Sequence, residues 1–380
     1  MYRYVLVIFL LIFVITGCSS IGPGRIYTDR KSYNDIVRET DYQQLLTNIV
    51  RLSYIEPTFY LKVTNITSSY SLNSSVSATP TFTNASGSAW GLTKSLEVTP
   101  SVSYSDSPTI SYIPIDDATF VAMLHRPISF DDITLIFNDG ISDIEVLARL
   151  AFNRVGDLDN ASSATTPKIV EKPEYIKYYR FIHLIVQLLE NKLATIDVAM
   201  IKDKSGLIFH FINKGANTSD AIELKKLLHV PVDSKDILFM AKATTTVKAN
   251  RSSTLIPENN NSKFNNLVYV QTRSVSGMLA FLSHSVIIPE AAQFREYRSY
   301  FEELEPLMKG LMKIYCSDNE PRNAFVKTYV NHHWFYISNT DINSKVTFTM
   351  LVRLMTVVFG NGYHTAQTAP VITVPVGARA

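Results

Sequence analysis

The sequence lacks the local motifs by which catalytic sites are usually recognised. It contains no G-x-S-x-G turn, no glycine-rich phosphate-binding loop, no H-E-x-x-H helix and no cysteine pair spaced for zinc. It also lacks an excess of charge of either sign, since 36 basic residues stand against 34 acidic ones. Nucleic-acid-binding chains need clustered Lys and Arg. We therefore expect a protein that is not an enzyme, needs no cofactor or metal, and binds no nucleic acid.

The histidines and acidic pairs add no catalytic pattern. His332-His333 is the only adjacent histidine pair, and on a strand its members would point to opposite faces, which disfavours joint metal binding. Asp116-Asp117, Asp131-Asp132 and Glu302-Glu303 lie near expected helix starts or on solvated helix faces, where acidic residues need no catalytic reason. A site assembled from residues far apart in the sequence stays compatible with this pattern.

The first residues of the chain are typical of a secretory leader. The basic residue Arg3 precedes an unbroken apolar run from Tyr4 to Ile15. A membrane-spanning helix needs about 20 apolar residues, so this shorter run fits the apolar part of a signal peptide better. The segment Ile15-Thr16-Gly17-Cys18 follows and resembles the lipobox of bacterial lipoproteins, although Leu is commoner at the first position and Ala or Ser at the second.

The lipobox resemblance implies that residues 1–17 are removed and that Cys18 carries the acyl chains. One acyl chain holds a protein at a membrane only marginally, at about 0.8 kcal/mol per buried methylene. Two or three acyl chains hold it there almost permanently. Ser19 stands where such lipoproteins carry Asp when they stay in the inner membrane, so the outer membrane is expected. An uncleaved signal anchor is the alternative. Cys316 is the only other cysteine, so no internal disulfide is expected.

The mature chain is long and apolar enough for a substantial core. Roughly 360 residues remain after cleavage, enough for one large domain or two ordinary ones. Hydrophobic residues make up 46% of the sequence. We predict an α+β fold with antiparallel sheet elements, packed helices and one long amphipathic β-hairpin. The expected parts are a tether at 18–32, an N-terminal α+β subdomain at 33–156, a polar boundary at 157–173 and a C-terminal α+β subdomain at 174–380.

Residues 70–105 carry the clearest pattern in the body. No charged side chain occurs from Val63 to Thr93, and apolar residues alternate with Ser, Thr and Asn on both sides of a turn at Asn84 to Ser88. Side chains alternate between faces along a strand, so the pattern predicts a long two-faced hairpin. The residues that we expect to contact a partner or the membrane are Tyr70, Leu72, Val76, Phe82, Trp90, Leu96, Val98, Val102 and Tyr104.

Two interpretations of the apolar face are open. It packs on the protein's own core, or it faces lipid or neighbouring subunits, as the strands of outer-membrane barrels do. A single hairpin cannot span a bilayer, because its edges would leave backbone groups without partners. The second interpretation therefore requires an oligomer. Lys94 lies on the apolar face and counts against it, although a Lys near a strand end can extend its amine to water.

Several stretches of the chain resemble a group of Gram-negative outer-membrane lipoproteins. They are Asn48 to Tyr54 with Glu56-Pro57, Ser107 to Pro114, Val268 to Ser274, Trp334 to Ile337 and Asp341 to Phe348. The resemblance spans most of the mature chain. It implies attachment to the outer membrane, facing the periplasm or the cell surface. No reaction is assigned to that group, so no catalytic residue carries over.

The sequence thus leads to one main functional hypothesis and two alternatives. In the main one, the protein is a non-catalytic, lipid-anchored structural or assembly component of an envelope complex. It is held by membrane lipid through its N-terminal acyl chains, and it contacts an envelope protein or its own copies through residues 70–105. The first alternative is an oligomeric pore built from the same hairpins. The second is a periplasmic hydrolase or ligand-binding protein whose pocket leaves no trace in the sequence.

Overall fold

The computed structural model describes residues 23–67, 70–84, 92–106, 109–115, 118–138, 143–169, 171–201, 204–242, 265–289, 301–360 and 372–375. The predicted signal peptide and Cys18 lie outside these residues. The chain forms two compact units. We call residues 1–59 with 116–365 the body, and residues 60–115 with 366–380 the ribbon unit. Helices, antiparallel and mixed sheets, and one long hairpin confirm the predicted α+β fold.

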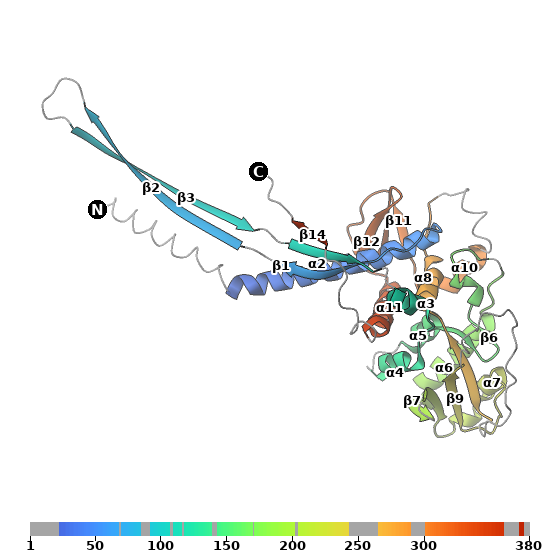
Figure 1. Cartoon of the computed structure of the whole chain (residues 1–380). Coiled ribbons are helices and arrows are strands. Elements are labelled where there is room, and N and C mark those ends of the chain that lie inside the picture. The colour runs from blue at the N-terminus through green and yellow to red at the C-terminus, as the bar shows by residue number, and fades with distance from the viewer. Residues whose placement is uncertain are drawn as a thin grey trace. The chain divides into compact units, whose positions relative to one another are not determined.

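The helices and strands follow each other as Figure 1 labels them. The helices are α2 (Pro23–Ser53), α3 (Ala118–His125), α4 (Phe130–Asn138), α5 (Ile144–Ala151), α6 (Ile176–Glu190), α7 (Ser219–Leu227), α8 (Val275–Ser283), α10 (Phe301–Met308) and α11 (Ile342–Gly360). The strands of the body are β5 (Phe152–Val155), β6 (Leu158–Asp159), β7 (Ala194–Ile201), β8 (Lys204–Phe211), β9 (Asp236–Ala241), β10 (Leu267–Thr272), β11 (Tyr315–Ser317), β12 (Ala324–Val330) and β13 (His333–Ser338). The ribbon unit holds β1 (Leu61–Thr67), β2 (Tyr70–Asn84), β3 (Leu92–Asp106), β4 (Thr109–Pro114) and β14 (Ile372–Pro375).

Helix α2 begins at Pro23, so residues 23–32, which we expected to be a tether, are helical. Proline is favoured in the first turn of a helix, because its missing N–H would have no partner there. The second half of α2 buries Leu46, Ile49 and Val50 against β12 and α8. The carboxamide of Asn48 then holds the chain beyond the helix, accepting from Phe59 N at 3.0 Å and donating to Phe59 O at 2.9 Å.

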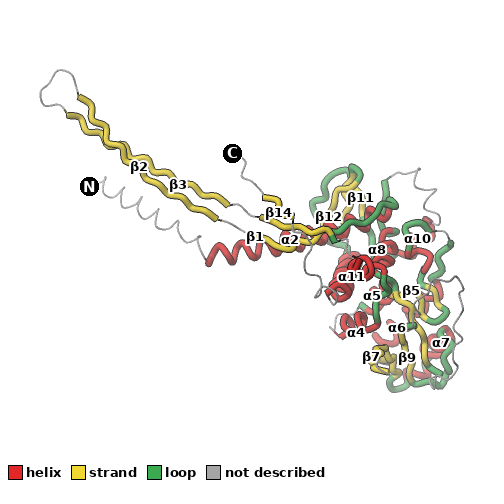
Figure 2. The backbone as a smooth tube through the Cα atoms, in the orientation of Figure 1, coloured by secondary structure: helices red, strands yellow, loops and turns green. Residues whose placement is uncertain are grey.

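The larger sheet of the body has six strands in the order β6-β5-β10-β9-β8-β7. Only the β10–β9 pair is parallel, and the other neighbours run antiparallel. Helices α4, α5 and α6 pack against this sheet, as Figure 2 shows in red and yellow. The polar segment 157–173, expected as a domain boundary, lies inside the body. Its β6 pairs with β5, and Asp159 accepts from the Ser162 backbone at 2.7 Å.

The body also contains a smaller sheet, β11-β13-β12, and helices α3, α7, α8, α10 and α11. The turn expected near His332 is present, and both Asn331 and His332 adopt positive φ there. Helix α11 is the one described helix whose length and composition would allow it to cross a membrane. It buries Phe348, Leu351 and Leu354 and packs against α3, α4, α5 and α8, which is also what a core helix does.

Two buried arginines satisfy the carboxyl ends of two helices. The last four carbonyl groups of a helix have no partner within it. Arg273, 2% exposed, donates to Arg149 O and Leu150 O at the end of α5, and to Asn160 O. Arg149, 4% exposed, donates to Leu307 O and Lys309 O at the end of α10. Burial lowers the pKa of the Arg273 guanidinium to about 10, so it is charged at neutral pH.

Replacing Arg273 should destabilise the body. The Arg273→Leu variant leaves Leu150 O and Asn160 O without their donors, and each unsatisfied buried group costs about 1–3 kcal/mol. We expect the free energy of unfolding, measured by urea denaturation, to fall by about 3 kcal/mol. The matched control is Arg322→Leu, at an exposed position, with an expected change below about 0.5 kcal/mol. Equal stabilities of the two variants would contradict the capping role.

Candidate functional site

Strands β2 and β3 form a two-stranded antiparallel ribbon. Each strand has 15 residues, and they pair along their whole length from Tyr70↔Asp106 to Asn84↔Leu92. Figure 1 shows the two arrows twisting about each other. A strand rises about 3.4 Å per residue, so the ribbon is about 50 Å long. The predicted hairpin is therefore confirmed, and its outer ends, Tyr70 and Asp106, lie within one residue of the predicted segment 70–105.

The register places positions of the same parity opposite each other, so that the apolar parity of β2 faces the apolar parity of β3. Leu72 lies opposite Tyr104, and Ala78 lies opposite Val98, while Ser77 lies opposite Thr99 on the other parity. Because directly paired residues project from the same side of a ladder, one face of the ribbon carries the apolar positions and the other the hydroxyl residues. Of the residues expected to contact a partner, Tyr70, Leu72, Val76 and Phe82 lie on β2, and Leu96, Val98, Val102 and Tyr104 lie on β3. Trp90 lies outside the described residues.

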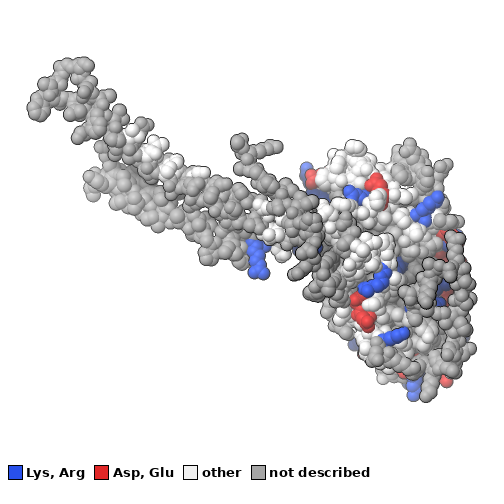
Figure 3. Space-filling view, in the orientation of Figure 1, with Lys and Arg blue, Asp and Glu red and all other residues white. Residues whose placement is uncertain are grey.

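The hydroxyl face is open to water. Ser75, Ser77 and Thr79 on β2 are exposed, as are Thr99, Ser101 and Ser103 on β3. Ser75 and Ser101, which face each other in the register, share a hydrogen bond of 2.7 Å between their hydroxyl oxygens. Figure 3 shows the described side chains of the ribbon in white, whereas Lys, Arg, Asp and Glu are interspersed on the visible face of the body. The side chains that the structure describes on this face are therefore small, uncharged hydroxyl groups.

The ribbon continues at its base into a second sheet with the same register. Thr67 pairs with Thr109 at the end of β1–β4, and Tyr70 pairs with Asp106 at the start of β2–β3. The step from one pair to the next is three residues on both sides, so the register is unchanged. A bulge between Val63 and Asn65 shifts the base by one residue. Strand β14 adds to the outer edge of β4, with Ile372 opposite Tyr112. The base is therefore three strands wide in the order β1-β4-β14.

The outer edges of β2 and β3 are available for pairing. Within the part of the chain that the structure describes, neither strand pairs with any strand but the other. Each edge therefore presents a row of backbone N–H and C=O groups that a further strand could bind. Natural proteins usually cover, shorten or charge such edges. Here they are 15 residues long and carry few charges, which makes them the candidate contact surface.

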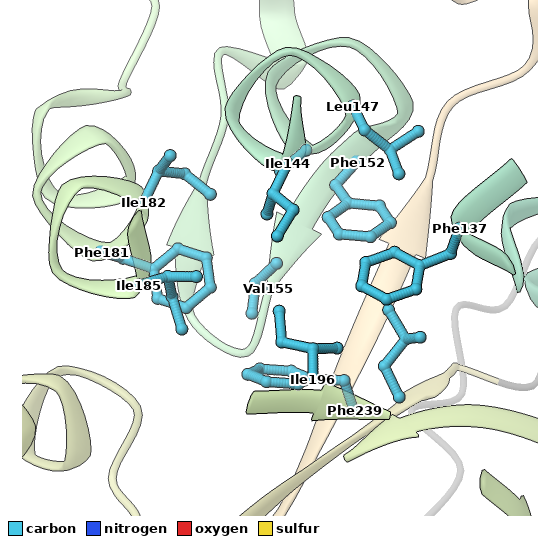
Figure 4. A pocket seen from close by; sticks show the side chains of 12 residues that line it. Phe137, Ile144, Leu147, Phe152, Val155, Phe181, Ile182, Ile185, Ile196 and Phe239 are labelled. Atoms are coloured by element: carbon cyan, nitrogen blue, oxygen red, sulfur yellow. The ribbon is translucent and has the colours of Figure 1, made fainter. Parts of the chain in front are cut away.

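The body contains an apolar cavity of about 50 Å³. Figure 4 shows side chains from α4, α5 and α6 facing those from the larger sheet across it. Its lining is Phe137, Ile144, Leu147, Ala148, Phe152, Val155, Phe181, Ile182, Ile185, Ile196, Leu207 and Phe239. These side chains hold no acid, base or nucleophile, so the cavity offers no group for hydrolysis.

One polar cluster escaped the sequence analysis. His210 on β8 lies between Thr195 on β7 and Asp236 on β9 in the register. Its Nδ1 is 2.5 Å from Asp236 Oδ1, and its Nε2 is 4.0 Å from Asp197 Oδ2. His210, Asp197 and Asp236 are far apart in the sequence, so only the strand pairing brings them together. All three side chains are substantially exposed, and their contacts are those of a surface ion pair.

The remaining sequence candidates are dispersed. His333 Nδ1 lies 2.9 Å from Asp318 Oδ1, while His332 occupies the turn. Among the residues that the structure describes, no three His, Cys, Asp or Glu side chains are arranged to hold a metal ion. Burial raises the pKa of the Cys316 thiol, which keeps it protonated at neutral pH.

Comparison of the chain with protein-family models, with curated proteins and with solved structures found no match.

The register of the ribbon can be tested with paired cysteines in a Cys316→Ser background. Ser75→Cys combined with Ser101→Cys should oxidise readily to a disulfide, because directly opposite Cβ atoms in an antiparallel ladder are about 5 Å apart. The control combines Ser75→Cys with Ser103→Cys, whose residues are diagonal neighbours about 7 Å apart. Thiol labelling after mild oxidation measures the free cysteine. Faster closure in the diagonal pair would show a different register.

Proposed function

We propose that the protein is a non-catalytic component of an outer-membrane assembly, anchored by acyl chains at Cys18, and that the ribbon β2–β3 is its assembly element. The observation that carries the proposal is the long ribbon with two uncovered strand edges. An isolated hairpin is at best marginally stable in water. A ribbon of this length therefore gains most from a partner that pairs with its edges and covers its apolar positions.

The anchor gives this element a location. Acyl chains on Cys18 would hold the chain at the membrane surface, and α2 begins five residues later at Pro23. Confinement to a surface raises the effective concentration of tethered copies for one another and for membrane partners. Weak contacts at the ribbon edges then suffice for a stable assembly. The expected location is the outer membrane, facing the periplasm or the cell surface.

Acylation at Cys18 is tested by replacing it. The Cys18→Ser variant should take up no label from an alkyne-tagged fatty acid fed to the cells, and it should leave the outer-membrane fraction, because Ser offers no thiol for the lipid. Cys316→Ser is the matched control, since it removes the other cysteine of the chain and should label and fractionate like the wild type. A Cys18→Ser protein that labels and fractionates normally would overturn the anchor.

The role of the ribbon is tested by shortening it. Residues 72–104 are replaced by an Asn-Gly turn, which joins two antiparallel strands and keeps the base β1-β4-β14. We expect the unfolding temperature of the body to stay unchanged and the high-mass species in detergent, measured by native mass spectrometry, to disappear.

The control for this experiment retains the alternation. Ser75→Thr combined with Ser101→Thr keeps hydroxyl groups at both positions and should assemble like the wild type. Loss of the folded body in the shortened variant would place the ribbon in the protein's own core. A high-mass species that survives the shortening would remove the ribbon from the assembly.

A further inference from the structure

We propose that the partner of the ribbon is a second copy of this chain, and that a ring of copies closes into a membrane-spanning β-barrel whose water-filled interior prefers cations because of Glu97. This inference rests on the proposed function and names its partner and activity. It starts from the positions of charge on the ribbon. Within β2 and β3, the charged residues are Lys94, Glu97 and Asp106.

The spacing of these charges matches a bilayer. Lys94 and Asp106 occupy the apolar parity, opposite Phe82 and Tyr70, and the positions of that parity between them carry no charge. Twelve residue steps separate the two charges, which is about 41 Å at 3.4 Å per residue and about 29 Å along a barrel axis when the strand is tilted by 45°. The apolar band of outer-membrane barrels is about 25 Å tall.

The ends of the band carry the residue types that such barrels place at the membrane surface. Tyr70 and Tyr104 stand at one end and Phe82 at the other, as in the aromatic girdles of outer-membrane barrels. Lys94, which counts against a lipid-facing surface when it is considered alone, falls at the edge of the band. A lysine there can reach the water beyond the hydrocarbon.

Edge pairing between copies removes the objection to a single hairpin in lipid. Backbone groups at an open edge have no hydrogen-bond partner in a bilayer, so only closed barrels are tolerated. β2 and β3 run antiparallel. The β3 edge of one copy therefore lies antiparallel to the β2 edge of the next copy in the same orientation. Repeating this head-to-tail contact around an axis closes a ring in which no ribbon edge is left.

The interior of such a barrel would be a water-filled channel. Its lining comes from the hydroxyl parity, on which Ser75, Ser77 and Thr79 of β2 and Thr99, Ser101 and Ser103 of β3 are already exposed to water. Barrels of about eight strands are filled by their own side chains, whereas about 16 strands leave an aqueous channel. With two strands from each copy, we expect a ring of about eight copies.

Glu97 is the one charged residue of the hydroxyl parity, where it lies opposite Thr79. Every copy contributes it at the same depth, so a closed ring carries a belt of carboxylates around the water. Rings of Asp or Glu favour cations, because they raise the local concentration of positive ions and repel anions. The same residue has no comparable role on an isolated ribbon in water.

The test uses the full acylated chain reconstituted in planar lipid bilayers with a KCl gradient. The wild type should form channels whose permeability for K⁺ exceeds that for Cl⁻ by about fivefold, and Glu97→Gln should lower this ratio to about one while channels still form. The matched control is Asp106→Asn, which removes a carboxylate of the other parity at the strand end and should leave the ratio unchanged.

The possible outcomes separate this inference from the proposed function. Channels whose selectivity is the same with and without Glu97 would overturn the placement of that residue in the lumen. Absence of channels, together with an assembly that still requires the ribbon, would overturn the pore and keep the assembly role with another partner. An assembly that forms without the ribbon would overturn both.

Discussion

The need of every backbone N–H and C=O group for a partner shapes both units of the protein. In the body, that need is met by side chains from distant parts of the chain: Arg273 donates to the last turn of α5, and Arg149 in that turn donates to the end of α10. In the ribbon, the backbone groups on the inner sides of β2 and β3 pair with each other. Among the described strands, none pairs with their outer edges. The sheets of the body also have edge strands, but the two ribbon edges are the longest, at 15 residues each, which is why the ribbon is the functional candidate.

The sequence predicted the ribbon well because the evidence for it is local. Alternation of apolar and hydroxyl residues depends only on the extended backbone, so it survives without knowledge of any partner. The two halves of the alternation then have a single register that pairs like parities. For the same reason the α+β fold and the turn near His332 followed from periodicity and turn chemistry.

Other features needed information that no local pattern holds. The contacts of Arg273 with Leu150 and Asn160 cross more than a hundred positions, and a lone Arg after a strand gives no sign of them. The segment 157–173 resembles a polar boundary because the bonds that join it to the sheet, such as that of Asp159 with Arg154 on β5, involve residues that a sequence cannot distinguish from solvated ones. Likewise, His210 meets Asp236 only because β8 pairs with β9.

Strand β14 has a consequence for the order of events during biosynthesis. Its residues 372–375 complete a sheet whose other strands, β1 and β4, are made before most of the body. Translation delivers a chain from its N-terminus onward, so the edge of β4 lacks this partner until residues 372–375 have been made. Pairing over such a distance along the chain is slow, because a large loop must close first. The base of the ribbon therefore forms late, because its sheet stays incomplete until β14 pairs with β4.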